Sequence, residues 1–254
     1  MSLLALLLTL LGLLSPARAS EQKIVYDLIL DGKIVGTREL SLTHIDPASP
    51  AEVEARLVRS WTSVDAPLGR DTVRYRSRGT ARNTDERTSF TVVTEEGGVT
   101  LEVQGRQLSD GTWATSITTR GRREDRTHRR LEVDLCTFDL VDPVRARRLA
   151  GRPSANILLA ETGQVVTGAV REARAAVTIG GQSVPVTRLT WSPPVGALSM
   201  AYTEDGLLVA YEAAFLGKTL QARARALPPP RDYGRIDTVI APALPPVEVE
   251  SEPL

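Results

Sequence analysis

Residues 23–42 read KIVYDLILDGKIVGTRELSL, two apolar-rich runs on either side of Asp31-Gly32. Because such runs flanking an Asp-Gly dipeptide are typical of paired antiparallel strands, the stretch predicts a β-hairpin. We expect a three-residue loop, Leu30-Asp31-Gly32, with Gly32 in the left-handed conformation that glycine adopts at low cost. Even-numbered residues then oppose even-numbered ones, and one face carries Ile24, Tyr26, Leu28, Ile34, Leu40 and Leu42.

The alternative register has a two-residue loop, in which Leu30 lies directly opposite Lys33. That register mixes apolar and charged residues on both faces of the hairpin, and a slip of one residue exchanges the faces. The cleaner separation therefore favours the three-residue loop. It also places Tyr26 across from Gly36, where the aromatic ring would cover a glycine of the neighbouring strand.

The chain downstream continues as short alternating or apolar segments separated by turn residues, which predicts further strands. In residues 51–62 we expect Val53, Ala55, Leu57 and Trp61 to share one face. The fold class that follows is all-β: an antiparallel curved sheet that forms a barrel or half-barrel, with one short helix. The further predicted strands are 71–80, 89–94, 99–103, 112–119, 156–160, 164–170, 173–179, 183–191, 198–203, 207–215 and 219–226.

The one predicted helix begins after Asp142, a good N-cap residue. Pro143 suits the first helical position, and Gly151 ends the run 144–150, so about two turns are expected. We interpret this helix as a plug or lid across a barrel end.

Residues 1–19 are predicted to be a signal peptide, because a leucine-rich run too short to span a membrane precedes Ala17-Arg18-Ala19, a small-x-small cleavage pattern. An uncleaved anchor is the alternative. Cleavage leaves one ordered domain, residues 20–226, followed by a proline-rich acidic tail, residues 227–254, whose composition cannot form a core. We therefore expect a periplasmic or secreted bacterial protein with no transmembrane span after cleavage.

Composition excludes several classes of function. The 254 residues carry 31 basic and 31 acidic side chains, so no global field attracts nucleic acid or anionic membrane. The most basic segment, residues 120–130, could bind an anion, but a solvated strand-loop-strand tip is the reading we favour. Cys136 is the only cysteine, which excludes an intrachain disulfide, and we expect a buried thiol rather than a nucleophile.

No catalytic or cofactor motif is present in the sequence. His44 and His128, the only histidines, are far apart in the chain. The acidic residues Glu132, Asp134, Asp139 and Asp142 do not have the spacing of a calcium loop, and Asp142 is better explained as a helix cap. We therefore expect no enzyme activity, no cofactor and no metal.

Three features resemble a known family: Tyr26, Gly32 and Gly36 in a Y-x5-G-x3-G hairpin, an Asp-led segment at 139–143, and an Asp-Gly hairpin followed by a glycine-turned strand at 205–226. They are similar to bacterial exported proteins of a domain-of-unknown-function family with lipocalin-like or Lol-type curved β-sheets. The resemblance implies a periplasmic barrel or half-barrel without an established activity, and it supplies no catalytic residues.

Two functional hypotheses remain. In the first, the concave face of the sheet holds an apolar ligand such as a lipid or acyl chain. In the second, the protein is a structural or accessory envelope protein that contacts a protein partner through its sheet edges or tail. The aromatic residues are candidate ligand contacts, although each could equally be core: Tyr26, Trp61, Tyr75, Trp113, Tyr202, Tyr211 and Phe215.

Overall fold

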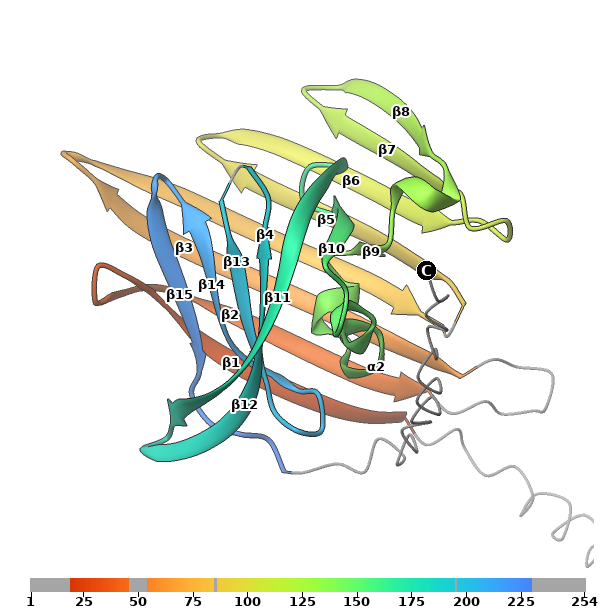
Figure 1. The fold of residues 1–254 in the computed structure, drawn as a ribbon. Helices are drawn as coiled ribbons and strands as arrows, with labels where there is room; N and C mark the ends of the chain where they lie inside the picture. Colours follow the sequence, from red (N-terminus) through yellow and green to blue (C-terminus); the bar gives the residue numbers. More distant parts are fainter. Residues whose placement is uncertain (1–18, 46–53, 85, 195, 230–254) are drawn as a thin grey trace, which may run out of the picture.

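The computed structural model describes residues 19–45, 54–84, 86–194 and 196–229 (Figure 1). Its strands form a single sheet in the order β8-β7-β6-β5-β4-β3-β2-β1-β15-β14-β13-β12-β11-β10-β9. Neighbouring strands are antiparallel except β9 and β10, which are parallel. Since β8 and β9 end the sheet at opposite sides, the curved sheet is barrel-like but not closed. The predicted fold class is confirmed.

The strands are β1 (Ala19–Leu30), β2 (Lys33–Ile45), β3 (Ala55–Leu68), β4 (Asp71–Asn83), β5 (Thr88–Glu96), β6 (Val99–Gln107), β7 (Trp113–Thr119), β8 (Arg122–His128), β9 (Leu135–Cys136), β10 (Ser154–Leu159), β11 (Gln164–Ile179), β12 (Gln182–Ser192), β13 (Leu198–Tyr202), β14 (Leu208–Phe215) and β15 (Lys218–Ala224). The helical turns are η1 (Arg130–Glu132), η2 (Asp139–Val141), α2 (Pro143–Ala146) and η3 (Arg147–Leu149). The segments predicted at 164–170 and 173–179 are one continuous strand, β11.

The first hairpin has a two-residue loop, so the prediction of a three-residue loop was wrong. Leu30 pairs with Lys33, and both loop residues have positive φ, 50° at Asp31 and 76° at Gly32. These are the backbone conformations of the tight turns whose twist matches that of paired strands. The loop length therefore follows from the geometry of the tight turn. The separation of apolar and charged faces, from which we predicted a three-residue loop, did not determine it.

A β-bulge in β2 then restores the separation of the faces. Ile29 pairs with Ile34 but Leu28 pairs with Gly36, so Val35 is the extra residue. Such a bulge places two residues of one strand opposite one of the other. Beyond the bulge even-numbered residues oppose even-numbered ones as predicted, but Tyr26 lies opposite Arg38 rather than Gly36.

Burial in the hairpin follows this corrected register. The side chains of Ile24, Tyr26, Leu28, Leu40 and Leu42 are all buried, with exposed fractions of 5% or less. Ile34, which precedes the bulge, is 64% exposed and was wrongly assigned to the core face.

The sheet curls so that its two halves face each other. Figure 1 shows the long strands of the N-terminal half as one broad layer, with β11 to β15 crossing in front of it. Ring contacts join the two layers, since Tyr75 on β4 and Phe215 on β14 meet edge to face with centroids 6.0 Å apart. The pairing of β1 with β15 joins the layers along one side.

Residues 135–149, which we call the plug segment, lie between the layers (Figure 1). Its helix α2 starts as predicted, with the Asp142 carboxylate accepting hydrogen bonds from the backbone N–H of Val144 (3.0 Å) and Arg145 (3.4 Å). The final turn is the 3-10 helix η3, and Gly151 follows with φ of 73°. The predicted short capped helix is thus present.

Two buried ion pairs fix the plug segment: one joins it to β3 of the N-terminal layer, and the other lies within the segment itself. Arg56 Nε on β3 lies 2.9 Å from Asp142 Oδ2, and Arg145 Nε lies 2.5 Å from Asp139 Oδ1. All four side chains are at most 2% exposed. Each carboxylate also accepts a hydrogen bond from a neutral side chain. Asn83 on β4 donates to Asp142, and Thr88 on β5 donates to Asp139, each at 2.9 Å. These two aspartates of the predicted acidic group therefore bind arginines within the fold.

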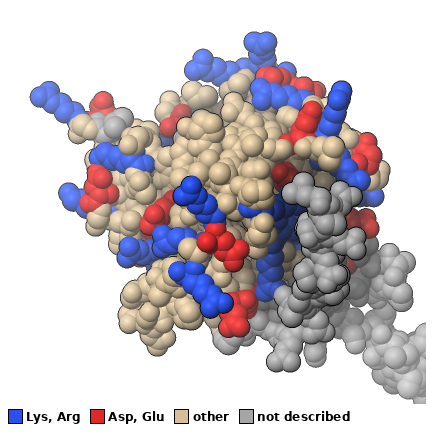
Figure 2. Space-filling model, in the orientation of Figure 1, with Lys and Arg blue, Asp and Glu red and all other residues tan. Residues whose placement is uncertain are grey.

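The basic segment 120–130 contains the turn after β7 and the edge strand β8. Two of its six arginines form ion pairs on the strand surface, Arg123 with Asp125 (2.9 Å) and Arg126 with Glu124 (2.7 Å). The solvated-tip interpretation is confirmed, and a charged edge strand of this kind discourages pairing with other chains. Figure 2 shows basic and acidic side chains mixed across the face in view.

The predicted signal peptide as far as Arg18, the connection 46–53 and the tail from residue 230 lie outside the described residues. In the described part of the chain, no helix combines the length and the apolar character needed to cross a membrane.

Candidate functional site

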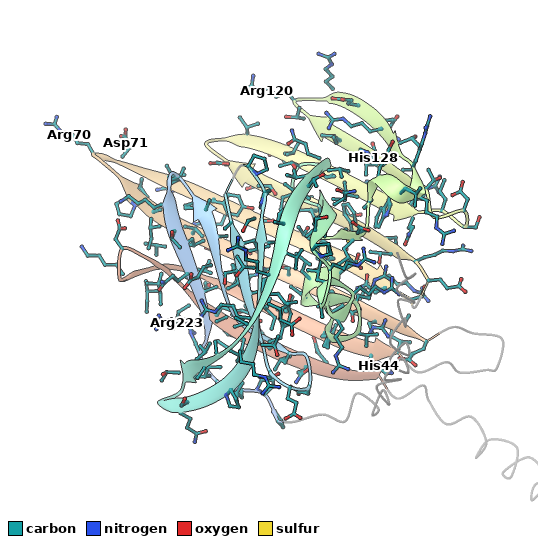
Figure 3. All side chains as sticks on the ribbon, viewed as in Figure 1. His44, Arg70, Asp71, Arg120, His128 and Arg223 are labelled. Carbon is teal, nitrogen blue, oxygen red and sulfur yellow. The ribbon has the colours of Figure 1, made fainter. Side chains whose placement is uncertain are left out.

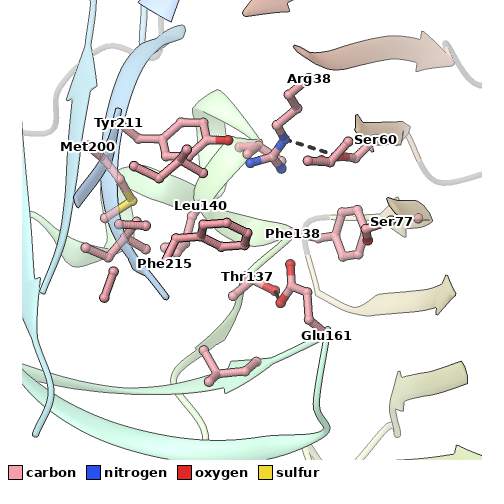
Figure 4. Close-up of a pocket in the computed structure, with 18 of the residues that line it drawn as sticks. Arg38, Ser60, Ser77, Thr137, Phe138, Leu140, Glu161, Met200, Tyr211 and Phe215 are labelled. Carbon is pink, nitrogen blue, oxygen red and sulfur yellow. Dashed lines mark hydrogen bonds between the residues drawn. The ribbon is translucent and has the colours of Figure 1, made fainter. Parts of the chain in front are cut away.

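A cavity of about 370 Å³ lies between the two layers of the curled sheet, with the plug segment forming part of its wall (Figure 4). This volume is within the range of small-molecule sites, about 300–1,000 Å³. Apolar and aromatic side chains make up most of the lining, among them Val64, Val92, Phe138, Leu140, Val141, Leu159, Trp191, Met200, Leu208, Phe215 and Leu220. The polar lining residues are Arg38, Ser60, Thr62, Tyr75, Ser77, Thr137, Glu161 and Tyr211.

Strand register places several of these polar residues in one row across the inner face of the N-terminal layer. Arg38 on β2 pairs with Thr62 on β3, Thr62 pairs with Ser77 on β4, and Ser77 pairs with Thr94 on β5. Cross-strand partners have their side chains on the same face of a sheet. The Arg38 guanidinium thus lies at one end of a row of hydroxyl groups, those of Thr62, Ser77 and Thr94, which we call the hydroxyl row.

Arg38 is half-buried and points into the cavity (Figure 4). Its Nε donates a hydrogen bond to Ser60 Oγ at 3.2 Å, and its Cζ lies 5.2 Å from the centroid of the Tyr211 ring. Burial lowers the pKa of Arg38, but the tyrosines and Glu161 more than offset this, so the group stays cationic. The ion pairs found among the described residues do not include Arg38, so Glu161 acts on it through its charge and not through a direct contact.

Glu161 approaches the cavity from the turn between β10 and β11. Its carboxylate accepts a hydrogen bond from Thr137 Oγ1 at 3.1 Å, and Thr137 Oγ1 in turn accepts one from the Ala160 N–H at 3.0 Å. Burial, with a further contribution from the Glu161 charge, raises the pKa of Tyr75 to about 12. Tyr75 is therefore a neutral phenol at physiological pH.

The predicted aromatic residues separate into three groups. Tyr75, Tyr211 and Phe215 line the cavity. Three others belong to the core, since Trp113 packs against Phe90, the Tyr26 hydroxyl donates to Leu208 O (2.6 Å), and the Tyr202 hydroxyl donates to Leu140 O (2.7 Å). Trp61 is 59% exposed and lies outside the cavity, because the β3 residues that face inward are Ser60, Thr62 and Val64.

Sequence reasoning missed Arg38, Ser60 and Glu161. A signal for Arg38 was available, because it occupies an even-numbered position on the apolar face of the first hairpin. A charged side chain on an otherwise apolar face needs a partner or a polar space. Glu161 carried no comparable signal, because it follows β10 in a turn, where acidic residues are common.

The two histidines and the cysteine lie outside the cavity. Figure 3 places His44 and His128 well apart, on β2 and β8. Cys136 is buried, as predicted, and burial together with the Asp139 charge raises the pKa of its thiol well above the usual range. Within the described ranges, no three His, Cys, Asp or Glu residues are grouped so that they could hold a metal ion.

No protein-family model matches this chain, and the search of curated proteins gave no match. Among solved structures, the chain is similar to the beta-barrel-like protein of domain of unknown function DUF1849 from Brucella abortus. The two are 13% identical, with a TM-score of 0.53, and the match covers 83% of this chain and 98% of that one. At this identity the likeness shows the fold alone. It supports the resemblance to bacterial β-barrel-like proteins of unknown function, but not a specifically lipocalin-like or Lol-type sheet.

Proposed function

We propose that this protein is a non-catalytic binding protein of the bacterial envelope that holds an apolar ligand, such as a lipid or acyl chain, in the cavity between its layers. The observation that carries the proposal is the cavity itself, whose lining is mostly apolar. A packed core of this size normally has few voids larger than a water molecule. Apolar surface facing a space of this volume is therefore better explained by an occupant than by imperfect packing.

The accessory-protein hypothesis has less support. It calls for a packed interior and a contiguous apolar surface on the outside. In the described part of the chain, the large exposed apolar residues are Ile34, Trp61, Leu131 and Leu227, which belong to separate segments. Isolated apolar residues of this kind are normal on protein surfaces.

The non-catalytic part of the proposal is supported by the positions of the reactive side chains. The lining residues of the cavity include neither histidine nor the Cys136 thiol. Location in the envelope rests on the predicted signal peptide.

Filling the cavity tests the proposal. Ala213 lines the cavity from β14, between the inward-facing Tyr211 and Phe215, so Ala213→Trp would place an indole in the space. The matched control is Ala210→Trp, the same change on the same strand, because Ala210 is also half-buried but lies on the opposite face. Binding is measured by fluorescence titration with N-phenyl-1-naphthylamine, an uncharged apolar probe, after circular dichroism has confirmed that both variants are folded.

We expect the unmodified protein and Ala210→Trp to bind the probe with similar affinity. The affinity of Ala213→Trp for the probe should be lower by at least about tenfold, equivalent to about 1.4 kcal/mol of binding free energy. Equal binding by all three proteins would place the probe elsewhere and contradict the proposal. Absence of binding to the unmodified protein would contradict it as well.

A further inference from the structure

We infer that the ligand is a single-chain amphiphile with an anionic end group, and that Arg38 together with the adjacent hydroxyl row binds that end. This inference rests on the proposed function and specifies the chemical class of the ligand. It combines four observations: a cation without an ion-paired carboxylate, hydroxyl groups beside it, an opposite charge across the cavity, and an apolar remainder of the cavity.

The first observation is the state of Arg38. An arginine that is partly withdrawn from water gains from a carboxylate partner, because the loss of its hydration is otherwise costly. The interior of this protein follows that rule elsewhere, since Arg56 and Arg145 each contact a buried aspartate. In the described residues, Arg38 instead contacts a serine hydroxyl and a tyrosine ring. The Arg38 guanidinium has five N–H donors, so its bonds to Ser60 and to the Tyr211 side chain leave capacity for a bidentate anion.

The second observation is the hydroxyl row. Thr62 and Ser77 follow Arg38 across the inner face of the sheet, and both line the cavity. Hydroxyl groups donate hydrogen bonds to carboxylate or phosphate oxygens, so they extend the anion site that the guanidinium begins. An apolar ligand alone would gain nothing from a cation and two hydroxyls on the wall.

The third observation is the opposite charge across the cavity. Glu161 enters from the C-terminal half and is held by Thr137. Its negative charge opposes the binding of an anion, while Arg38 favours it. Substitutions of the two residues must therefore change the affinity for an anionic amphiphile in opposite directions, a result that a purely structural role for Arg38 would not produce.

The apolar part of the lining determines where the chain would lie. Phe138, Leu140, Met200 and Phe215 come from the plug segment and the C-terminal half and face the polar row (Figure 4). A ligand with its charged end at Arg38 would therefore extend its chain toward these side chains. The cavity volume suits one chain rather than a two-chain phospholipid.

The test compares probes of equal chain length. Dodecanoate and dodecyl phosphate carry an anionic end, whereas dodecanol does not, and each is titrated by its displacement of N-phenyl-1-naphthylamine. The proteins are the unmodified chain, Arg38→Met and Glu161→Gln. Glu161→Gln is close to isosteric with the unmodified side chain. It therefore allows the preference for anionic probes to be measured even if Arg38→Met fails to fold.

We expect at least one anionic probe to bind the unmodified protein about tenfold or more tightly than dodecanol, the gain typical of a charge-assisted hydrogen bond. Arg38→Met should abolish this preference, and Glu161→Gln should strengthen it. The tighter of the two anionic probes identifies the end group as carboxylate or phosphate.

Equal affinity for dodecanol and both anions would overturn this inference and leave the proposed function in place. A Glu161→Gln variant with unchanged preference would also count against it. Failure of all three probes, together with failure of N-phenyl-1-naphthylamine, would overturn the proposed function itself.

Discussion

Replacing Asp142 by alanine should destabilise the protein far more than the removal of a surface carboxylate such as that of Asp65. The Asp142 carboxylate is completely buried and joins three parts of the fold. It accepts hydrogen bonds from Arg56 on β3 and Asn83 on β4, both at 2.9 Å, and it caps α2. Asp142→Ala removes all of these bonds at once.

The magnitude can be estimated from these contacts. Breaking a buried ion pair by removing one partner costs about 3–5 kcal/mol, because a buried charge loses its main compensation. Loss of an N-cap costs about 1 kcal/mol. The two effects share one carboxylate and overlap, so we expect a loss of about 4 kcal/mol in the free energy of unfolding, or about 10 °C in Tm.

Urea denaturation followed by circular dichroism measures this loss, and Asp65→Ala provides a matched control. Asp65 also accepts two hydrogen bonds from an arginine, Arg76, at 2.8 and 3.0 Å. Its side chain is 52% exposed, however, and exposed pairs contribute about 0–1 kcal/mol. The two variants therefore remove similar bonds from environments of very different burial.

Equal and small losses in Asp142→Ala and Asp65→Ala would refute the reasoning that the buried pair of Asp142 with Arg56 holds the plug segment. A double-mutant cycle with Arg56→Met adds a second criterion. Since the two residues interact directly, the double variant should be less destabilised than the sum of the single variants. Strict additivity would show that Asp142 and Arg56 do not stabilise each other.

Three further predictions follow from burial and backbone conformation. The Cys136 thiol should resist iodoacetamide in the folded protein at about pH 8 and react after unfolding in urea, because burial raises its pKa; rapid labelling of the folded protein would contradict its burial. Burial also raises the pKa of Tyr26, Tyr75 and Tyr202 above the ordinary value near 10. Unfolding above about pH 10 therefore releases protons from these tyrosines. The free energy of unfolding, measured from urea midpoints, should fall between about pH 10 and 12 by up to about 1.4 kcal/mol per pH unit for each tyrosine. A free energy of unfolding that stays constant over this pH range would be inconsistent with neutral buried phenols. Finally, Gly32→Ala should cost about 1–2 kcal/mol of stability, because alanine is strained at the observed φ of 76°; an unchanged midpoint would disprove the assigned turn.

The sequence was sufficient to predict most of the strands, the capped helix and the buried thiol, because each depends on local pattern. β8 and β9 were not among the predicted strands, and β11 was predicted as two. The hairpin shows where local pattern becomes ambiguous. Alternation required even-numbered residues to face one another, and either a three-residue loop or a bulge satisfies that requirement. The two-residue turn with a bulge at Val35 was not considered, and the error misplaced Ile34 and the partner of Tyr26.

The candidate site was less predictable, because it depends on contacts between distant parts of the chain. Tyr75 and Tyr211 face one cavity only because β1 pairs with β15 and the sheet curls, which no local pattern specifies. Trp61 was assigned to the wrong face because it shares an odd-numbered position with Ala55 and Leu57. The inward face of β3 instead carries the even-numbered residues, including Val58, Ser60, Thr62 and Val64. Aromatic identity was a weaker guide to the cavity than the unmatched charge of Arg38.

Native mass spectrometry of the protein purified from its own envelope shows directly whether the cavity holds a ligand. We predict a bound species with the mass of a single-chain amphiphile, present in the unmodified protein and in Ala210→Trp and absent from Ala213→Trp. An apo mass for the unmodified protein, with another protein bound in place of a lipid, would contradict it.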